Sequence, residues 1–241
     1  MTLSKWERPW ELIDSAPVPQ GSDTMELVRR GNEVVIRVGN RELMGNHVHG
    51  SEDALADFAC DLLPDRLHNA HFLVGGLGMG FTLAAALRRV GPDATVVVAE
   101  LVPAIVKWNR GILGEVAGFP LKDPRTSVFL GDVAARIRSS EPEAWDAIVL
   151  DVDNGPVALT RASNHALYSP EGLDAARAAL RVGGVLGVWS AAPDKAFTRR
   201  MDRAGFDVVA HEVRSRGARG GQMHVVWIGT RRAVGPRWAT A

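Results

Sequence analysis

The sequence predicts an α/β fold built on a mostly parallel, seven-stranded sheet that ends in an antiparallel hairpin. From about residue 70, apolar strands alternate with helical stretches, which is typical of a parallel sheet covered on both faces. The last two strands, 206–214 and 223–231, are joined only by SRGARGGQ. So short a connection allows antiparallel pairing alone.

A domain boundary is predicted at residue 50. Residues 1–50 form an N-terminal segment and a small antiparallel β-meander, because Gly-Asn pairs at 31–32 and 39–40 separate short β-branched runs within 25–49. Residues 51–241 form the α/β domain, which opens with a helix over 52–63. Its parallel strands are expected at 71–76, 95–100, 126–132, 145–152 and 184–190, and its helices at 81–90, 102–113, 133–139, 170–180 and 196–206.

The antiparallel end of the sheet narrows the fold class. A dinucleotide-binding Rossmann domain is expected to end in a sixth parallel strand. A sheet that closes with an antiparallel last strand has the class I methyltransferase-like, Rossmann-like arrangement instead. A chain of 241 residues accommodates one such domain with the meander attached.

Net charge, cysteine content and the first residues bear on binding partners and on cellular location. The formal net charge is zero, so there is no general electrostatic reason to expect nucleic acid or an anionic membrane. The single cysteine, Cys60, forms no internal disulfide and favours a reducing compartment. The first residues carry charges and prolines where a signal peptide needs an apolar core. We therefore expect a cytoplasmic protein.

Polar residues and glycines gather where the predicted parallel strands end, which is where doubly wound sheets bind ligands. The glycines after the first strand let a ligand approach the backbone. Glu100 ends the second strand, where a carboxylate accepts both hydroxyls of a ribose. Asp132 ends the third strand, where it accepts from an adenine amine. The candidate nucleotide-binding residues are Gly75, Gly76, Gly78, Gly80, Glu100, Leu101, Gly131, Asp132, Val133 and Asp151.

Each of these residues also has a purely structural interpretation. Glycines after a strand form tight turns, a Glu there suits a helix N-terminus, and Asp132 suits an N-cap. The ordered occurrence of all of them favours a nucleoside site. Phe81 stands where the Gly76-x-Gly78 pattern would need a third glycine. An NAD-dependent dehydrogenase is therefore disfavoured.

Several motifs together resemble one family. The segments GGLGMG, VVVAELVPAIVKWNRG, DPRTSVFLGDV, WDAIVLDVDNGP, LYSPEGL and RVGGVL are similar to those of the spermidine synthase (polyamine aminopropyltransferase) family, over roughly residues 25–190. The resemblance implies a site for S-adenosyl-L-methionine (AdoMet) or decarboxylated AdoMet, with Glu100 at the ribose and Asp132 at the adenine. It implies that Asp151 is the base that deprotonates an attacking amine. That family is usually oligomeric, and the exposed meander edges favour a homodimer.

The chain departs from the family pattern at its carboxylates. Gly78 replaces the aspartate of the GGGDGG loop, Asn154 replaces the second carboxylate of D-x-x-D-P, and GNHVHGSED replaces the Tyr-x-Glu segment. A buried ammonium needs partners, so these losses disfavour putrescine as acceptor and favour AdoMet over its decarboxylated form. We expect methyl transfer to a small molecule. Aminopropyl transfer, as in a true spermidine synthase, and a non-catalytic nucleoside-binding protein stay open.

The reacting end is expected beside the fourth parallel strand. A nucleophile would attack in line the carbon next to the sulfonium, so that positioning supplies much of the rate. Asp151 and Asp153 are the candidate catalytic residues, with Asp151 as general base. The two imidazoles of 47–49 have no third ligand at suitable spacing, so no metal is expected. Candidate acceptor contacts are His49, Ser51, Glu52, Asn154, Tyr168 and Trp189. Whether residues 1–24 cover the site stays open.

Overall fold

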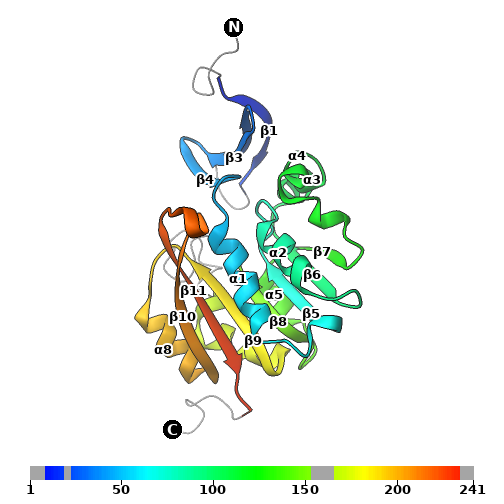
Figure 1. The fold of residues 1–241 in the computed structure, drawn as a ribbon, viewed down its shortest axis with the longest axis vertical. Coiled ribbons are helices and arrows are strands. Elements are labelled where there is room, and N and C mark those ends of the chain that lie inside the picture. The colour runs from blue at the N-terminus through cyan, green and yellow to red at the C-terminus, as the bar shows by residue number, and fades with distance from the viewer. Residues whose placement is uncertain (1–8, 19–22, 153–165, 234–241) are drawn as a thin grey trace.

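An antiparallel sheet lies at one end of the molecule, above the α/β domain (Figure 1). The computed structural model describes residues 9–18, 23–152 and 166–233. The strands of this sheet pair in the order β1-β2-β3-β4 and are β1 (Glu11–Pro17), β2 (Thr24–Arg30), β3 (Glu33–Val38) and β4 (Arg41–Gly45). The sequence predicted the last three. It missed β1, whose segment ELIDSAP is half exposed and lacks the alternation of a strand with one buried face.

The main sheet confirms the predicted fold class. Its seven strands lie in the order β10-β11-β9-β8-β5-β6-β7. Neighbouring strands from β7 to β9 run parallel, whereas β11 is antiparallel to both β9 and β10. The strands are β5 (His71–Gly75), β6 (Thr95–Glu100), β7 (Thr126–Leu130), β8 (Trp145–Leu150), β9 (Leu180–Ser190), β10 (Phe206–Arg214) and β11 (Met223–Arg231).

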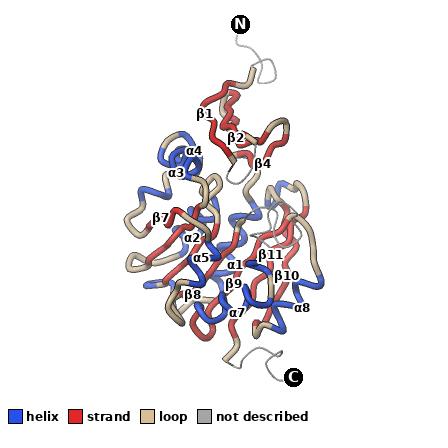
Figure 2. Tube along the Cα trace, turned by 180° about the vertical axis from the view of Figure 1, so that it is seen from behind, coloured by secondary structure: helices blue, strands red, loops and turns tan. Residues whose placement is uncertain are grey.

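Helices cover both faces of this sheet, and the alternation of side chains along each strand decides which residues meet them. Phe72 and Val74 of β5 join one hydrophobic cluster, whereas Leu73 between them joins the other. The first cluster takes in α1 (Gly50–Asp61), α2 (Phe81–Arg89), α3 (Pro103–Arg110) and α4 (Ile112–Ala117). The second takes in α5 (Val133–Arg138), α7 (Pro170–Ala179) and α8 (Lys195–Arg203), seen from behind in Figure 2.

The helix expected over 102–113 is interrupted at Gly111. This residue has φ −114° and ψ −120°, outside the helical region, so α3 ends before it and α4 begins after it. Glycine accepts such a conformation without a Cβ clash, which is why the apolar spacing alone did not reveal the break.

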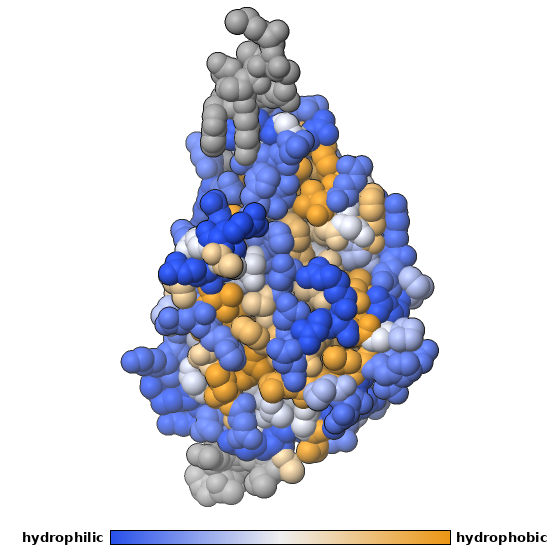
Figure 3. Space-filling view, viewed as in Figure 1, coloured by the Kyte–Doolittle hydropathy of each residue, from blue (hydrophilic) through white to orange (hydrophobic). Residues whose placement is uncertain are grey.

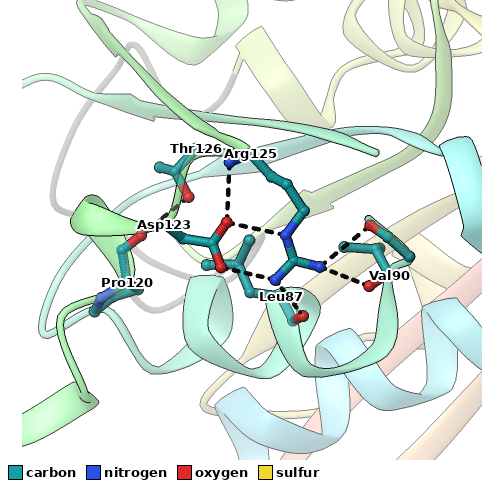
Figure 4. A network of polar contacts seen from close by, with 7 residues as sticks. Leu87, Val90, Pro120, Asp123, Arg125 and Thr126 are labelled. Atoms are coloured by element: carbon teal, nitrogen blue, oxygen red, sulfur yellow. Dashed lines mark hydrogen bonds and ion pairs between the residues drawn. The ribbon is translucent and has the colours of Figure 1, made fainter. Parts of the chain in front are cut away.

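Arg125 ties the start of β7 to the end of α2 (Figure 4). Its guanidinium donates to both carboxylate oxygens of Asp123, at 2.9 and 2.7 Å, and to the carbonyl oxygens of Leu87, Val90 and Gly91. The otherwise unpaired carbonyls at the end of a helix are thereby satisfied by one planar side chain. This contact fixes the connection that leads from the second to the third parallel strand.

Candidate active site

The carboxyl ends of four parallel strands are held together by backbone hydrogen bonds. The N–H of Asp151 donates to the carbonyl of Gly75 at 2.8 Å, and the N–H of Gly76 donates to that of Ala99 at 2.9 Å. On the far side, the N–H of Gly131 donates to the carbonyl of Glu100 at 2.8 Å. The structure therefore brings the ends of β8, β5, β6 and β7 to one edge, as parallel pairing requires.

The glycine loop is required by close backbone packing. Gly76 has φ +89°, and a Cβ atom there would lie 2.2 Å from the carbonyl oxygen of Asp151. Gly78 has φ +50°, and its Cβ would lie 2.8 Å from both Sδ and Cε of Met44. The side chain of Met44, from β4, thus occupies the space that a side chain at position 78 would need. The glycines are therefore needed both for the left-handed backbone of the turn and for the close approach of Asp151 and Met44.

Glu100 organises the glycine loop. Its Oε2 accepts from the N–H of Leu77 at 2.9 Å, and its Oε1 accepts from the N–H of Val102 at 2.8 Å. The residue is only 8% exposed. Burial raises the pKa of Glu100, and the hydrogen bonds from backbone amides oppose that rise. The backbone amides of Gly78 and Leu101 act on this carboxylate in the same direction as those of Leu77 and Val102, so Glu100 faces the backbone of both strand ends.

The third strand end carries a helix cap. Asp132 is the N-cap of α5, and its Oδ1 accepts from the N–H of Ala134 at 2.8 Å. Val133 is buried against Gly75, at which a Cβ would come within 2.8 Å of its Cγ2 atom. Leu101, at the neighbouring strand end, is 37% exposed. Asp132 therefore has the structural role of an N-cap, which uses one of its two carboxylate oxygens.

Asp151 receives a strong hydrogen bond from the first turn of α2. The hydroxyl of Thr82, a residue that is 2% exposed, donates to Oδ2 of Asp151 at 2.6 Å. Donation to a carboxylate favours its charged form. The second candidate catalytic residue, Asp153, and the candidate acceptor contact Asn154 lie outside the described residues.

A buried polar group lies at the start of α1. Ser51 is fully buried; its hydroxyl donates to Oε2 of Glu52 at 2.6 Å and accepts from Nε1 of Trp189 at 3.0 Å. Its Oγ also lies 2.9 Å from Nδ1 of His224. Burial and, second to it, the negative charge of Asp151 raise the pKa of Glu52 to about 7. Three of the predicted acceptor contacts, Ser51, Glu52 and Trp189, therefore lie together, and the charge of Asp151 acts on one of them, Glu52.

Two further predicted contacts are placed differently. His49 stacks on Phe81 with ring centroids 4.2 Å apart, and its Nδ1 lies 2.7 Å from Oδ2 of Asp53. Tyr168 is buried in the second hydrophobic cluster, with its ring edge against Phe197. Trp189 packs on the first cluster, so Tyr168 lies with the opposite face of the sheet. Within the described ranges, neither His49 nor Tyr168 is hydrogen-bonded to Ser51.

Sequence reasoning missed three residues of this region. His224 is the second residue of β11, Thr82 is the second residue of α2, and Met44 is the last but one residue of β4. His224 carried a weak signal, because it is a polar residue entering an apolar strand that pairs with β9. The other two carried none, since each contact joins segments whose relative placement depends on the completed fold.

Two whole-chain properties bear on binding partners. Among the described residues, no helix is long and apolar enough to cross a membrane. In the same ranges, no three His, Cys, Asp or Glu side chains lie close enough to hold a metal ion.

The fold is the class I methyltransferase-like arrangement that is also seen in spermidine synthases. Spermidine synthase from Thermotoga maritima superposes with a TM-score of 0.72 at 17% identity, covering 91% of this chain and 72% of that one. A spermidine synthase solved with the transition-state analogue AdoDATO gives 0.71 at 17% identity and the same coverage. A probable spermidine synthase from Corynebacterium glutamicum gives 0.59 at 16% identity, covering 91% and 80%. These likenesses establish the fold.

Sequence comparison points to the same group of proteins. Putrescine N-methyltransferase 2 of Nicotiana attenuata is 32% identical over 114 residues, which are 47% of this chain and 29% of that protein. The corresponding protein of Nicotiana tabacum is 32% identical over 114 residues, 30% of its length. The chain thus matches less than a third of these relatives, and no family model matches it. The resemblance to the spermidine synthase-like transferases is confirmed.

Proposed function

We propose that the chain is a transferase that moves the methyl group of AdoMet to a nitrogen nucleophile of a small molecule. The spermidine synthase fold supports a nucleoside sulfonium donor, and the partial similarity to putrescine N-methyltransferases supports methyl transfer to an amine. The retained Glu100 and Asp151 side chains oppose a non-catalytic nucleoside-binding protein. They lie at the strand ends where binding and reaction are expected.

The observation that carries the choice of methyl transfer is the contact of Met44 with Gly78. The spermidine synthase resemblance implies an aspartate at this loop position to hold the ammonium of an aminopropyl group. Here the end of the Met44 side chain lies 2.8 Å from where a Cβ atom at position 78 would be. A thioether gives an ammonium no charge partner, so an aminopropyl donor would lose its counter-ion. AdoMet is the donor that fits this loop better.

Each group of residues then has a role. Glu100 would accept the ribose hydroxyls, and Asp132, Leu101 and Val133 would lie at the adenine. The glycine loop would face the sulfonium end. Asp151 would contact the nucleophile, with Asp153 as the second candidate catalytic residue. Reaction would proceed by in-line displacement, with positioning as the main source of rate.

Aminopropyl transfer is the second candidate, because all three reported structural neighbours are spermidine synthases or a probable one. Calorimetric titration with AdoMet, S-adenosylhomocysteine, decarboxylated AdoMet and methylthioadenosine separates the two. Methyl transfer predicts tighter binding of the first pair. Tighter binding of the second pair would contradict it, and binding of none would exclude the nucleoside site.

A double variant tests the reason for the preference. The variant Met44→Ala with Gly78→Asp clears the space and supplies a carboxylate, and aspartate tolerates the left-handed conformation of position 78. We expect it to gain affinity for decarboxylated AdoMet relative to AdoMet. The matched control is Met44→Ala with Gly78→Asn, which has the same shape without the charge. Equal behaviour of both would exclude the ammonium explanation.

The oligomeric state and the cellular location of the protein are also proposals. Apolar side chains gather on the lower half of the face in Figure 3. On the described part of the chain, a groove of about 660 Å³ between α1 and β10 includes Phe58, Leu62, Val208, Val209 and Ile228. Leu62 is 50% exposed and Val209 is 56% exposed. We propose a cytoplasmic homodimer without a nucleic-acid or membrane partner, and sedimentation equilibrium tests the dimer.

A further inference from the structure

Asn109 is a buried polar residue among the apolar residues of α3. It is 1% exposed, and its neighbours Ile105, Val106 and Trp108 on the same helix belong to the first hydrophobic cluster. Asparagine is a poor helix former, and the buried stripe of such a helix is normally apolar. The contacts of the side chain must therefore explain why an asparagine lies there.

The side-chain amide of Asn109 holds the glycine loop. Its Nδ2 donates to the backbone carbonyl of Gly78 at 2.8 Å and to that of Ile105, one turn earlier in α3, at 2.9 Å. Only the NH₂ group can donate to two carbonyl oxygens, so these partners fix which way the amide points. The contact with Gly78 joins α3, which follows the second parallel strand, to the loop that follows the first.

The oxygen of the same amide is unsatisfied. Oδ1 of Asn109 is buried and accepts no hydrogen bond from the described residues. It lies 2.9 Å from where a Cβ atom at Gly80 would be, so it also faces the glycine loop. A buried acceptor without a partner lowers stability. A leucine of similar size would avoid that cost, so the asparagine is explained by its contact with Gly78 rather than by packing.

The contact with Asn109 also sets the orientation of one peptide group. In a trans peptide the carbonyl and the following N–H point in opposite directions, and the described residues contain no cis peptide bond. Since the carbonyl of Gly78 points at α3, the N–H of Met79 points away from it. Glycine has the backbone freedom to let this peptide turn over. Without the Asn109 donor, a carbonyl could take the place of that N–H.

Asn109 is itself held in place, as a residue that positions another must be. The two residues before it bind the N-terminal sheet: Lys107 Nζ and Trp108 Nε1 donate to Oδ2 of Asp14 at 2.7 and 2.8 Å. Trp108 is 3% exposed, so this attachment is part of the packed interior. Helix α3 thus gives the Asn109 amide a fixed position from which to hold the loop.

We propose that Asn109 is a positioning residue of the donor site, which keeps the glycine loop in the one peptide orientation that the donor nucleoside recognises. The inference rests on the proposed function, in which this loop faces the sulfonium end of AdoMet. Because Asn109 is 1% exposed, it acts through the carbonyl of Gly78 rather than by touching the donor. Loss of its amide therefore weakens donor binding without removing a group that contacts the donor.

The variant Asn109→Leu keeps the size of the side chain and removes both polar atoms. It deletes the unpaired Oδ1 and leaves the carbonyl of Gly78 without its donor, so the two effects on stability oppose each other. We expect the urea midpoint to stay close to that of wild type. In calorimetry, the Kd for S-adenosylhomocysteine should rise about tenfold or more.

Two further variants guard against a general effect on the fold. Ile105→Val trims a buried side chain of the same helix, so it should lower the urea midpoint and keep the wild-type Kd. Asn109→Ala repeats the main test with a side chain too small to overfill the site. It should lower the urea midpoint as the Ile105 variant does, and unlike that variant it should also raise the Kd.

Amide hydrogen exchange reports on the loop without any ligand. The N–H of Leu77 is bonded to Glu100, and the N–H of Gly80 is bonded to the carbonyl of Leu77. Both amides should exchange about tenfold faster in Asn109→Leu than in wild type, because the loop between them loses its attachment to α3. Unchanged rates would show that Asn109 does not hold the loop and would overturn the proposal.

The binding results separate the inference from the function on which it rests. A wild-type Kd for Asn109→Leu would overturn the proposal, while the proposed function would stand. An equal rise of the Kd in Ile105→Val would overturn it too, because loosening of α3 would then explain the loss. No binding of S-adenosylhomocysteine by the wild-type chain would instead contradict the proposed function, and the exchange rates would still test the hold of Asn109 on the loop.

Discussion

The carboxylate of Glu100 accepts a hydrogen bond from the backbone N–H of Leu77 at 2.9 Å. One residue at the end of the second parallel strand thereby holds the loop that ends the first. Its other oxygen holds the N–H of Val102, where the next helix starts. A residue predicted for a ligand is thus also a structural residue, and substitutions there affect both properties.

Glu100→Gln should lower both stability and ligand affinity. The amide NH₂ would face a backbone N–H that needs an acceptor, which costs about 1–3 kcal/mol for a buried group. We also expect at least a tenfold loss of AdoMet affinity. Urea unfolding and calorimetry measure the two effects. The exposed Glu141→Gln is the control, and wild-type stability of Glu100→Gln would show that the amide contact contributes nothing.

Gly76→Ala should be far more damaging than Gly118→Ala, although both glycines have positive φ, +89° and +77°. At Gly118 an added Cβ meets nothing within 4 Å, so only the left-handed conformation is penalised, by about 1 kcal/mol. At Gly76 it meets the Asp151 carbonyl at 2.2 Å, which raises the expected cost to about 2–4 kcal/mol. Equal midpoints in urea would contradict the packing explanation.

Glu52 should make the stability of the protein depend on pH. Its pKa is raised on folding from 4.5 to about 7, so the folded state holds the proton more tightly. The corresponding stability is present below about pH 4.5 and is lost as pH rises through 7. The loss is at most about 3 kcal/mol. Glu52→Gln should therefore gain stability over wild type between pH 5 and pH 8 in urea unfolding, and a constant difference would contradict the shift.

Asp14 should anchor the N-terminal sheet to the α/β domain. Its Oδ2 accepts from Lys107 Nζ at 2.7 Å and from Trp108 Nε1 at 2.8 Å, and these two hydrogen bonds lower the pKa of Asp14 to about 2. Its contribution is present above pH 3.8 and is lost as pH falls toward 2. Asp14→Asn should speed amide exchange in β1. Glu11→Gln, which breaks only the exposed pair with Arg29, should not.

The sequence predicted those features that depend on local pattern. Strands β10 and β11 begin and end where expected, because alternating apolar runs and a short connection specify a hairpin. The ends of the parallel strands were predicted as a group, since topology alone brings them together. By contrast, Ser51 and His224 are 173 residues apart and meet only because α1 packs beside β11. No spacing rule reports such a contact, and the same holds for Asp14 and Trp108.

The contact of Met44 with the glycine loop joins the two sheets of the protein. The loop belongs to the parallel sheet, and the thioether above it belongs to a hairpin strand of the other sheet. Exchange of β3 and β4 would therefore change the side chain beside the loop without altering any strand of the α/β domain. If the proposed donor site is correct, this hairpin is a segment that protein engineering can exchange to retune the choice of sulfonium donor.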